Sequence, residues 1–209
     1  MERRTFLKGT AGMVAGLMGA GAFAAEAAKS GEAKWTPLFN GKDLTGWKPE
    51  GKAVWNVADG CIVGVQGPGA APGDLFTEQE YGDFEVRVVY KIQWPANSGV
   101  WFRYQAPDKA YQADILEYKN PVAYSGTIYC PAKMFLSRNE DKALEKREDW
   151  NTMLIKAQGD HLVVTLNGVV TGDVHENSYA KGKIGFQVHP GDEFKNMQIS
   201  VREVSLRTL

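Results

Sequence analysis

The chain has 209 residues, 44% of them hydrophobic, and it carries 24 basic and 25 acidic side chains. This length is enough for one domain with a sizeable core, and the near-neutral charge gives no reason to expect nucleic acid or an anionic membrane as a partner. Two cysteines and three histidines show no zinc-type spacing. Cys61 and Cys130 could form a disulfide in an oxidising compartment, but two free thiols are the simpler expectation.

Residues 1–24 have the features of a cleavable export signal. A basic start that contains the paired Arg3 and Arg4 precedes a Gly/Ala-rich apolar run, which ends in Ala-Phe-Ala at 22–24. The run is too short and too rich in glycine to remain as a membrane-spanning helix. Paired arginines indicate twin-arginine export, so we expect a periplasmic or secreted protein with no membrane attachment in its mature form. Cleavage would leave a linker at 25–34 and a mature charge of about −3.

After the linker the chain is typical of a series of short strands. Residues 35–47 form a turn-rich segment, and 53–57 and 61–65 form a hairpin around an Asp-Gly turn. The clearest strand is 84–94, in which apolar and polar side chains alternate with a period of two. Alternation of this kind predicts a strand with one face in the core and one face toward solvent.

Further strands follow at similar spacing. They are expected at 97–104, 111–118, 150–157, 161–166, 182–189 and 194–206, with a tight Asn-Gly turn at 167–168. The charged segment 137–149 should hold one short helix or a solvated loop. Many short strands with almost no helical periodicity predict an all-β domain at 35–209, an antiparallel β-sandwich of jelly-roll type.

The strand at 111–118 carries the polar residues around which a site is best built. A strict two-residue period puts Gln112 and Asp114 on one face and Glu117 on the other. A β-bulge between Asp114 and Glu117 would return Glu117 to the face of the other two, and we expect that bulge. The three side chains would then line one groove. The alternative is an exposed strand face that carries ordinary charges.

Side chains suited to binding a sugar occur in the neighbouring strands. Trp101 and Arg103 alternate out of the strand at 97–104, and Gln187 and His189 share the polar face of the strand at 182–189. A sugar needs an apolar ring face on which to stack and planar groups that bond its hydroxyls. Further candidates for substrate contact are Asn97, Tyr129 and Lys133, although a surface lysine is usually only solvated.

The spacing Gln112-x-Asp114-x-x-Glu117 resembles the Glu-x-Asp-x-x-Glu strand of laminarinase-type β-glucanases. In those enzymes the first Glu is the nucleophile and the last is the acid/base. An amide at the first position cannot attack the anomeric carbon as a carboxylate does, so a retaining mechanism with paired carboxylates lacks its nucleophile here. A conventional glucanase is therefore disfavoured. Either the protein only binds glycans, or it cleaves them by a route that needs no such nucleophile.

Six motifs, in the same order, resemble the 3-keto-disaccharide hydrolase family. They are Leu-Phe-Asn-Gly-Lys-Asp-Leu-Thr-Gly-Trp at 38–47, Asn-Ser-Gly-Val-Trp-Phe-Arg at 97–103, Ser-Gly-Thr-Ile-Tyr at 125–129, Trp-Asn at 150–151, Leu-Asn-Gly at 166–168 and Gly-x-Ile-Gly-x-Gln-x-His at 182–189. The resemblance covers nearly the whole mature chain and implies a concanavalin A-like sandwich. The family's central strand usually reads Glu-x-Gln-Ile-Leu-Asp, whereas this chain has Gln-Ala-Asp-Ile-Leu-Glu at 112–117.

The resemblance implies cleavage of a 3-keto-glycoside or 3-keto-disaccharide. A ketone at C3 acidifies the C2 proton, a base removes that proton, and the aglycone leaves from C1 before water adds back. Nearby donors or a metal would stabilise the enolate. The expected roles are His189 or Glu117 as base, Asp114 as the group that assists the leaving oxygen, Arg103 and Tyr129 as holders of the keto oxygen, and Trp101 as the stacking ring.

Two further expectations concern ligands. A divalent cation bound by Asp114, Glu117 and His189 is compatible with this set, because mixed carboxylate and imidazole ligands suit such metals, although the residues do not require one. The rival function is a non-catalytic glycan-binding module of lectin type. In such a module Trp101 and Arg103 would still be needed to bind the glycan, whereas Glu117 could be replaced without loss of binding.

Overall fold

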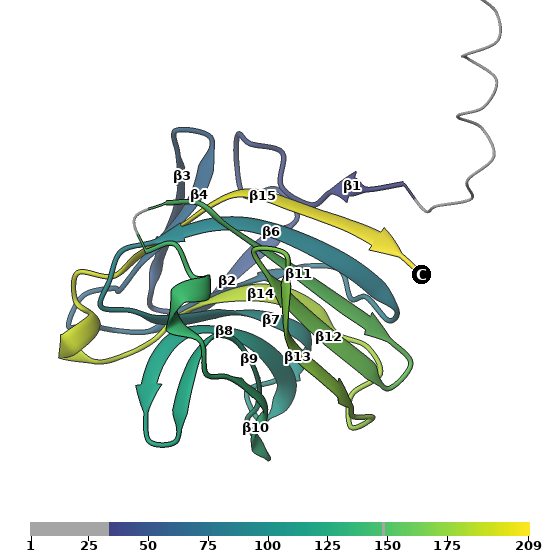
Figure 1. Ribbon diagram of the computed structural model, residues 1–209. Coiled ribbons are helices and arrows are strands. Elements are labelled where there is room, and N and C mark those ends of the chain that lie inside the picture. The colour runs from purple at the N-terminus through teal and green to yellow at the C-terminus, as the bar shows by residue number, and fades with distance from the viewer. Residues whose placement is uncertain (1–33, 148) are drawn as a thin grey trace, which may run out of the picture. The chain divides into compact units, whose positions relative to one another are not determined.

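The computed structural model describes residues 34–147 and 149–209, which form two antiparallel sheets (Figure 1). The predicted all-β sandwich is therefore confirmed. The expected export signal at 1–24 and most of the expected linker at 25–34 lie outside the described residues. In the described part of the chain, no helix has the length and apolar character needed to cross a membrane.

One sheet has eight strands. They are β1 (Thr36–Pro37), β3 (Val54–Ala58), β4 (Cys61–Val65), β6 (Phe84–Ile92), β11 (Asn151–Gln158), β12 (His161–Leu166), β13 (Val169–His175) and β15 (Gln198–Thr208). Their order in space is β13-β12-β11-β6-β15-β4-β3, and β1 pairs with β15. Neighbours that are distant in sequence, such as β6 and β15, make this a crossed topology rather than a simple meander.

The other sheet has seven strands. They are β2 (Trp47–Gly51), β5 (Gly73–Thr77), β7 (Asn97–Ala106), β8 (Lys109–Lys119), β9 (Val122–Cys130), β10 (Met134–Asn139) and β14 (Lys183–Val188). Their order is β10-β9-β8-β7-β14-β5-β2. The charged segment expected as a short helix or loop holds one 3-10 turn at Lys142–Leu144, and a second such turn lies at Asp192–Phe194.

The predicted turns and alternation are confirmed where the sequence signal is local. Asp59 and Gly60, at the turn between β3 and β4, have φ angles of 50° and 72°. Asn167 and Gly168 repeat the pattern between β12 and β13, with 50° and 87°. Two consecutive turn residues with positive φ angles give a turn whose twist matches that of the strands in an antiparallel hairpin. In β6 the predicted apolar face is buried at Phe84, Val86, Val88, Tyr90 and Ile92.

The hydrophobic core fills the space between the sheets. Phe102, Tyr111 and Ile115 of the seven-stranded sheet belong to the same buried cluster as Val88 and Met153 of the other. The opposite face of the seven-stranded sheet is not covered by the second sheet. Burial of large apolar side chains, worth about 25 cal/mol for each Å² of apolar surface, is the main term that holds the two layers together.

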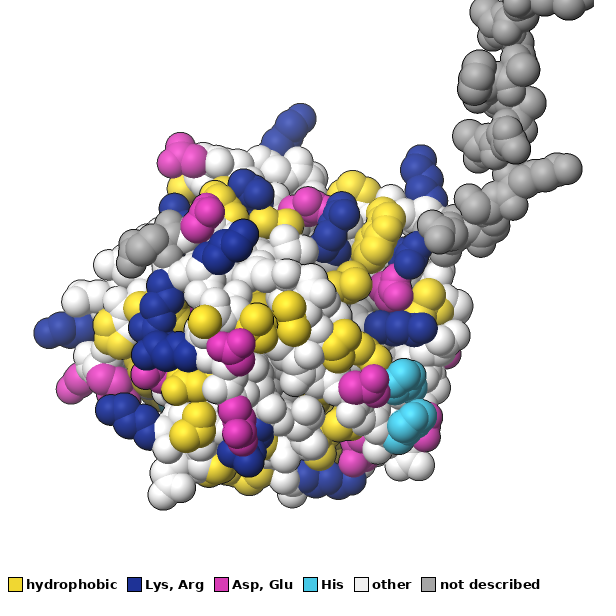
Figure 2. Space-filling view, viewed as in Figure 1, with side chains coloured by type: hydrophobic (Ala, Val, Ile, Leu, Met, Phe, Trp, Pro, Cys, Tyr) yellow, Lys and Arg dark blue, Asp and Glu magenta, His cyan; other side chains and the backbone are white. Residues whose placement is uncertain are grey.

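The surface shows no dominance of one charge. On the face drawn in Figure 2, basic and acidic side chains are interspersed, and two histidines lie side by side next to acidic groups. These are His161 and His175, whose rings stack with centroids 4.7 Å apart and whose nitrogens contact Asp173 and Asp160, respectively. Both cysteines are free, as expected.

Strand β7 is interrupted at Arg103, whose φ angle is +49°. The pairing of β7 with β8 runs without a break from Asn97 to Phe102 and shifts before Ala106. This irregularity breaks the alternation of side chains, as β-bulges do. As a result Trp101 and Tyr104 lie on the same face, with ring centroids 5.8 Å apart, and Arg103 points away from them into the protein.

The guanidinium of Arg103 is fully buried and connects three loops. Its Nε donates to the carbonyl of Gly82 (3.1 Å), and its Nη1 donates to those of Gly159 (2.8 Å) and Tyr179 (3.2 Å). Its Nη2 pairs with the Asp83 carboxylate at 2.9 Å. The prediction that Arg103 contacts substrate is therefore wrong, because the left-handed residue turns this side chain into the interior.

We expect Arg103→Ala to lower the free energy of unfolding by about 3 kcal/mol, because it leaves buried carbonyls and the Asp83 charge without their donor. Arg138→Ala, which removes a half-exposed guanidinium paired with Glu140, should change it by about 0.5 kcal/mol or less. Urea denaturation of the mature chain measures both variants. Equal losses of unfolding free energy in the two variants would show that the buried hydrogen bonds and ion pair of Arg103 contribute no more to stability than a surface ion pair does.

Candidate functional site

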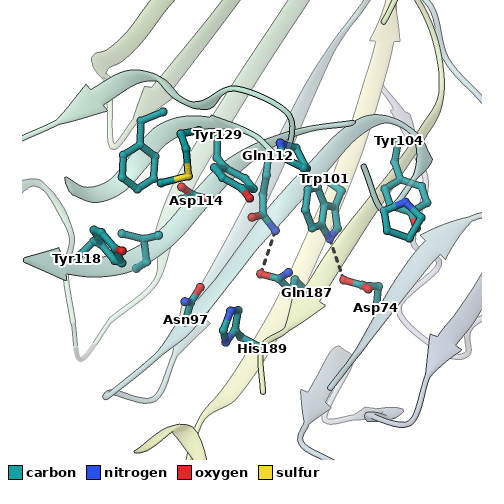
Figure 3. A pocket seen from close by; sticks show the side chains of 15 residues that line it. Asp74, Asn97, Trp101, Tyr104, Gln112, Asp114, Tyr118, Tyr129, Gln187 and His189 are labelled. Carbon is teal, nitrogen blue, oxygen red and sulfur yellow. Dashed lines mark hydrogen bonds between the residues drawn. The ribbon is translucent and has the colours of Figure 1, made fainter. Parts of the chain in front are cut away.

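A pocket of about 430 Å³ lies on the uncovered face of the seven-stranded sheet (Figure 3). This volume is in the range of small-molecule sites. The polar and aromatic residues that line it are Asp74, Asn97, Trp101, Tyr104, Gln112, Asp114, Tyr118, Tyr129, Phe135, Gln187 and His189. The pocket therefore brings together Asn97, Trp101, Gln112, Asp114, Tyr129, Gln187 and His189 of the side chains proposed from the sequence.

The register of the strands aligns the pocket residues across the sheet. Asp74 of β5 lies opposite Gln187 of β14, and Trp101 of β7 lies opposite Gln112 of β8. Gln112 in turn lies opposite Tyr129 of β9. Opposed residues point to the same face of an antiparallel sheet. Trp101 lies opposite Gly185 of β14, two residues before Gln187, so the five strands deliver two neighbouring rows of side chains to one hollow.

The centre of the pocket is an amide pair. The Nε2 of Gln112 donates to the Oε1 of Gln187 at 3.2 Å, and Gln112 is only 3% exposed. Its side chain lies directly over Gly99, where an added Cβ would come within 2.6 Å of the Gln112 Cδ. A glycine at 99 is thus needed for this packing, which explains the Ser-Gly step at the start of β7.

Asp114 supplies a buried carboxyl to the pocket. It is 2% exposed, and its Oδ2 has no hydrogen-bond partner in the described part of the chain. Burial raises the pKa of Asp114 well above its ordinary value, because no cation compensates the lost hydration. Burial thus favours the protonated form of this carboxyl, which is the form that can donate a proton.

Asp74 is a second carboxyl in the pocket, and the sequence reasoning missed it. Its Oδ1 accepts a hydrogen bond from the Trp101 Nε1 at 2.8 Å. Burial raises the pKa of Asp74 to about 6; the nearby Glu50 charge adds to this effect, and the indole donor opposes it. The only signal for it was a polar residue in the short apolar run at 73–77, directly after a Pro/Gly-rich loop.

His189 follows β14 and presents an imidazole to the pocket. Its Nδ1 lies 2.7 Å from the carbonyl oxygen of Pro190. A carbonyl can only accept, so Nδ1 carries the hydrogen and Nε2 of the neutral ring keeps its lone pair. The ring also packs edge-on against Phe194, at 5.7 Å between centroids. His189 is thus oriented as a hydrogen-bond acceptor or base.

Tyr129 lies beside the carboxyl of Asp114 in the pocket (Figure 3). Burial raises the pKa of the Tyr129 hydroxyl, and the neighbouring Asp114 reinforces the shift. The hydroxyl consequently stays protonated and can donate to an oxygen that gains negative charge. The Tyr129 ring contacts Phe135 edge-on, and Trp101, Tyr104 and Tyr118 are further aromatic residues of the pocket.

Glu117 lies outside this pocket. The pairing of β8 with β9 keeps one register from Ala113 opposite Ile128 to Glu117 opposite Tyr124, so the predicted bulge between Asp114 and Glu117 is wrong. Without it, Glu117 stays on the opposite face of the strand from Asp114. The structure therefore does not bring Glu117 to the pocket beside Asp114, where the catalytic role was predicted.

Glu117 forms ion pairs with two cationic side chains outside the pocket. Lys142 pairs with it at 2.9 Å, and Arg147 pairs with its second oxygen. Hydrogen bonds from Lys142 and then Arg147 hold the pKa of Glu117 below its ordinary value. The expected metal set of Asp114, Glu117 and His189 is therefore not assembled. Within residues 34–147 and 149–209, no three His, Cys, Asp or Glu side chains are grouped to bind a metal.

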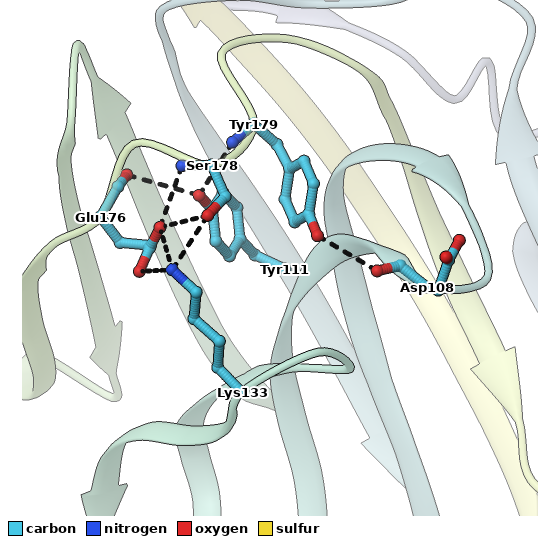
Figure 4. A network of polar contacts seen from close by, with 6 residues as sticks. All are labelled: Asp108, Tyr111, Lys133, Glu176, Ser178 and Tyr179. Carbon is cyan, nitrogen blue, oxygen red and sulfur yellow. Dashed lines mark hydrogen bonds and ion pairs between the residues drawn. The ribbon is translucent and has the colours of Figure 1, made fainter.

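Lys133 also lies outside the pocket, in a separate polar network (Figure 4). Its Nζ contacts both carboxylate oxygens of Glu176 (2.8 and 2.9 Å) and the hydroxyl of Ser178 (3.0 Å). The backbone nitrogen of Tyr179 donates to the Tyr111 hydroxyl in the same cluster. Lys133 thus fastens the turn after β9 to the segment between β13 and β14, and the structure does not bring it into the pocket with the other predicted substrate contacts.

Removing the indole donor should raise the pKa of Asp74. In Trp101→Phe the carboxylate loses the hydrogen bond that favours its charged form, so the pKa should move above its present value of about 6. A ¹³C NMR titration of the Asp74 carboxyl measures this directly. Trp150→Phe, directly before β11 of the other sheet, is the matched control and should leave the titration unchanged. A lower or constant value in Trp101→Phe would contradict the described bond.

Solved structures with the same fold include several proteins connected with carbohydrates. A protein from Parabacteroides distasonis, provisionally assigned as a glycosyl hydrolase, is 25% identical, with a TM-score of 0.65 over 84% of this chain and 100% of that one. A Bacillus subtilis protein with a galectin-like fold has a TM-score of 0.64 at 14% identity over 84% of this chain and 94% of its own. The carbohydrate-binding module CBM66 of B. subtilis has a TM-score of 0.57 at 14% identity over 80% and 98%. The last two show the fold alone.

Sequence comparison is more specific. A 3-keto-disaccharide hydrolase of Bacteroides thetaiotaomicron is 32% identical over 74 residues, which are 31% of this chain and 26% of that protein. The matched segment thus spans about a quarter of that relative. The family described as 3-keto-alpha-glucoside-1,2-lyase-like domains matches residues 34–200, which include all the pocket residues described above. With a match over most of its length, the chain belongs to this family of 3-keto-alpha-glucoside-1,2-lyase-like domains.

Proposed function

We propose that the protein is an exported enzyme that cleaves the glycosidic bond of a 3-keto-glycoside or 3-keto-disaccharide. The observation that carries this proposal is that one pocket holds both the buried carboxyl of Asp114, whose protonated form burial favours, and the acceptor nitrogen of His189. Family membership supports a carbohydrate substrate, and the aromatic lining suits the faces of a sugar ring.

The chemistry of a 3-keto-sugar matches a pocket that has proton-transfer groups, because cleavage beside a ketone needs an acid and a base rather than a nucleophile. The ketone makes the C2–H bond acidic. A base takes that proton, and the electron pair delocalises onto the C3 oxygen as an enolate. The enolate collapses, the C1–C2 double bond forms, and the C1–O bond to the aglycone breaks while the leaving oxygen gains a proton. Water then adds at C1 and a proton returns to C2, which completes a net hydrolysis.

The pocket residues divide these tasks. The Nε2 of His189 takes the C2 proton and later returns it, and Asp114 gives its proton to the leaving oxygen. When water adds to C1, the Asp114 carboxylate takes the water's proton and is restored. The Tyr129 hydroxyl and the Gln112 amide line the pocket and donate hydrogen bonds to the enolate oxygen. Arg103 was expected to share this role with Tyr129. Trp101 and Tyr104 provide ring surface for the sugar.

Removing the base should abolish most turnover. We expect His189→Ala to lower kcat/KM for methyl 3-keto-glucoside by at least about 100-fold, the usual contribution of a general base. His161→Ala, on the other sheet, is the control and should retain wild-type turnover, because its ring contacts His175 and Asp173 only at the surface. Release of methanol and the keto-sugar is followed by chromatography. Equal activity of the two variants would remove His189 from the mechanism.

The rival proposal is a glycan-binding module without catalysis. It is favoured by the likeness of the fold to a carbohydrate-binding module and by the aromatic pocket. Titration of the wild-type protein with unmodified and 3-keto sugars separates the two functions. Binding without product supports the module, and product release supports the enzyme.

Export is inferred from the sequence of residues 1–24, which carry the twin arginine and the Ala-Phe-Ala end. The mature chain would then act in the periplasm or outside the cell. N-terminal sequencing of the protein recovered from a periplasmic fraction, in cells with and without the twin-arginine pathway, tests the inference. Recovery of the uncleaved chain in the cytoplasm in both strains would contradict it.

A further inference from the structure

A second hollow, of about 840 Å³, adjoins the pocket. The two share three lining residues, Asn97, Tyr118 and His189. Asn97 and Tyr118 lie at the end of the pocket beyond Asp114, whereas Asp74 lies at the opposite end (Figure 3). The second hollow therefore continues the pocket on the side where the acid of the proposed reaction is placed.

Three side chains of the second hollow, those of Trp94, Glu117 and Arg147, contact one another. The guanidinium of Arg147 lies over the indole of Trp94, with its carbon 4.1 Å from the ring centroid. The same guanidinium pairs with Glu117, which is also bonded by Lys142 at 2.9 Å. A stacked and paired arginine presents its remaining N–H groups in a preorganised plane, which lowers the entropy lost on binding.

The charge of the second hollow indicates what it can hold. Glu117 and Glu193 contribute two carboxylates, and Lys119 and Arg147 contribute two cations. An anionic group such as a phosphate or a uronate would meet the two carboxylates as well as the cations. A neutral ligand with many hydroxyls can donate to the carboxylates and accept from the cations at the same time.

We propose that this hollow, organised by Arg147 and Trp94, binds the leaving group of the glycoside, and that this group is a neutral sugar. The inference rests on the proposed function, because it places the bond to be cleaved at the junction of the two hollows. The keto-sugar lies between Trp101 and Asp114, its C1 oxygen points toward Asp114, and the second sugar extends past His189. Glu117 then contributes to substrate choice rather than to bond cleavage.

The experiment compares two substrates on each protein preparation, the 3-keto derivative of cellobiose and methyl 3-keto-glucoside. The methyl group does not reach the second hollow. Arg147→Ala should lower the ratio of kcat/KM for the disaccharide to that for the methyl glycoside roughly tenfold, through the loss of a charge-assisted contact. Arg138→Ala, at another exposed ion pair, should leave the ratio unchanged. The ratio does not depend on the folded fraction, since both rates come from the same sample.

An unchanged ratio in Arg147→Ala would overturn the proposal, even if both rates fell together. Failure of wild type to turn over either substrate would instead count against the proposed function. Binding then decides the inference, by NMR of the wild-type protein titrated with unmodified cellobiose. Shifts of the Trp94 indole and Arg147 Nε signals support the second sugar site, and shifts confined to Trp101 overturn it.

Discussion

The left-handed backbone at Arg103 is the constraint on which both sides of the seven-stranded sheet depend. On the inner side it places a fully buried guanidinium against three loop carbonyls and the Asp83 carboxylate. On the outer side it brings Trp101 and Tyr104 to one face. A positive φ at a residue with a Cβ carries a conformational cost, and it persists because many hydrogen bonds require this one arrangement.

The pocket concentrates groups that are expensive to bury. Asp114 has an unpartnered oxygen, and Asp74 keeps its single indole donor in a setting that raises its pKa to about 6. A fold selected for stability alone would replace such groups with apolar ones. Their presence on the face of the seven-stranded sheet that the other sheet leaves open is best explained by use in chemistry or binding. The amide pair of Gln112 and Gln187 is neutral, so it adds no charge that would lower the two carboxyl pKa values.

The parts of the fold that depend on local sequence could be predicted. Alternation identified β6, and Asp-Gly and Asn-Gly pairs identified two hairpins. The shared face of Gln187 and His189 followed from the same period of two. The bulges could not be predicted, because nothing in the residue type of Arg103 indicates a positive φ, and nothing excluded a bulge before Glu117. Asp74 was missed because its partner Trp101 is distant in the chain, and only the sheet order places them together.

The two unbonded cysteines have a consequence for the conditions in which the protein can fold. Cys61 belongs to β4 in one layer and Cys130 to β9 in the other, and neither is bonded. The sandwich thus holds together by packing and hydrogen bonds, without a covalent cross-link that would have to be oxidised. Such a chain can reach its final conformation in a reducing compartment as well as in an oxidising one, with no assistance from thiol oxidases.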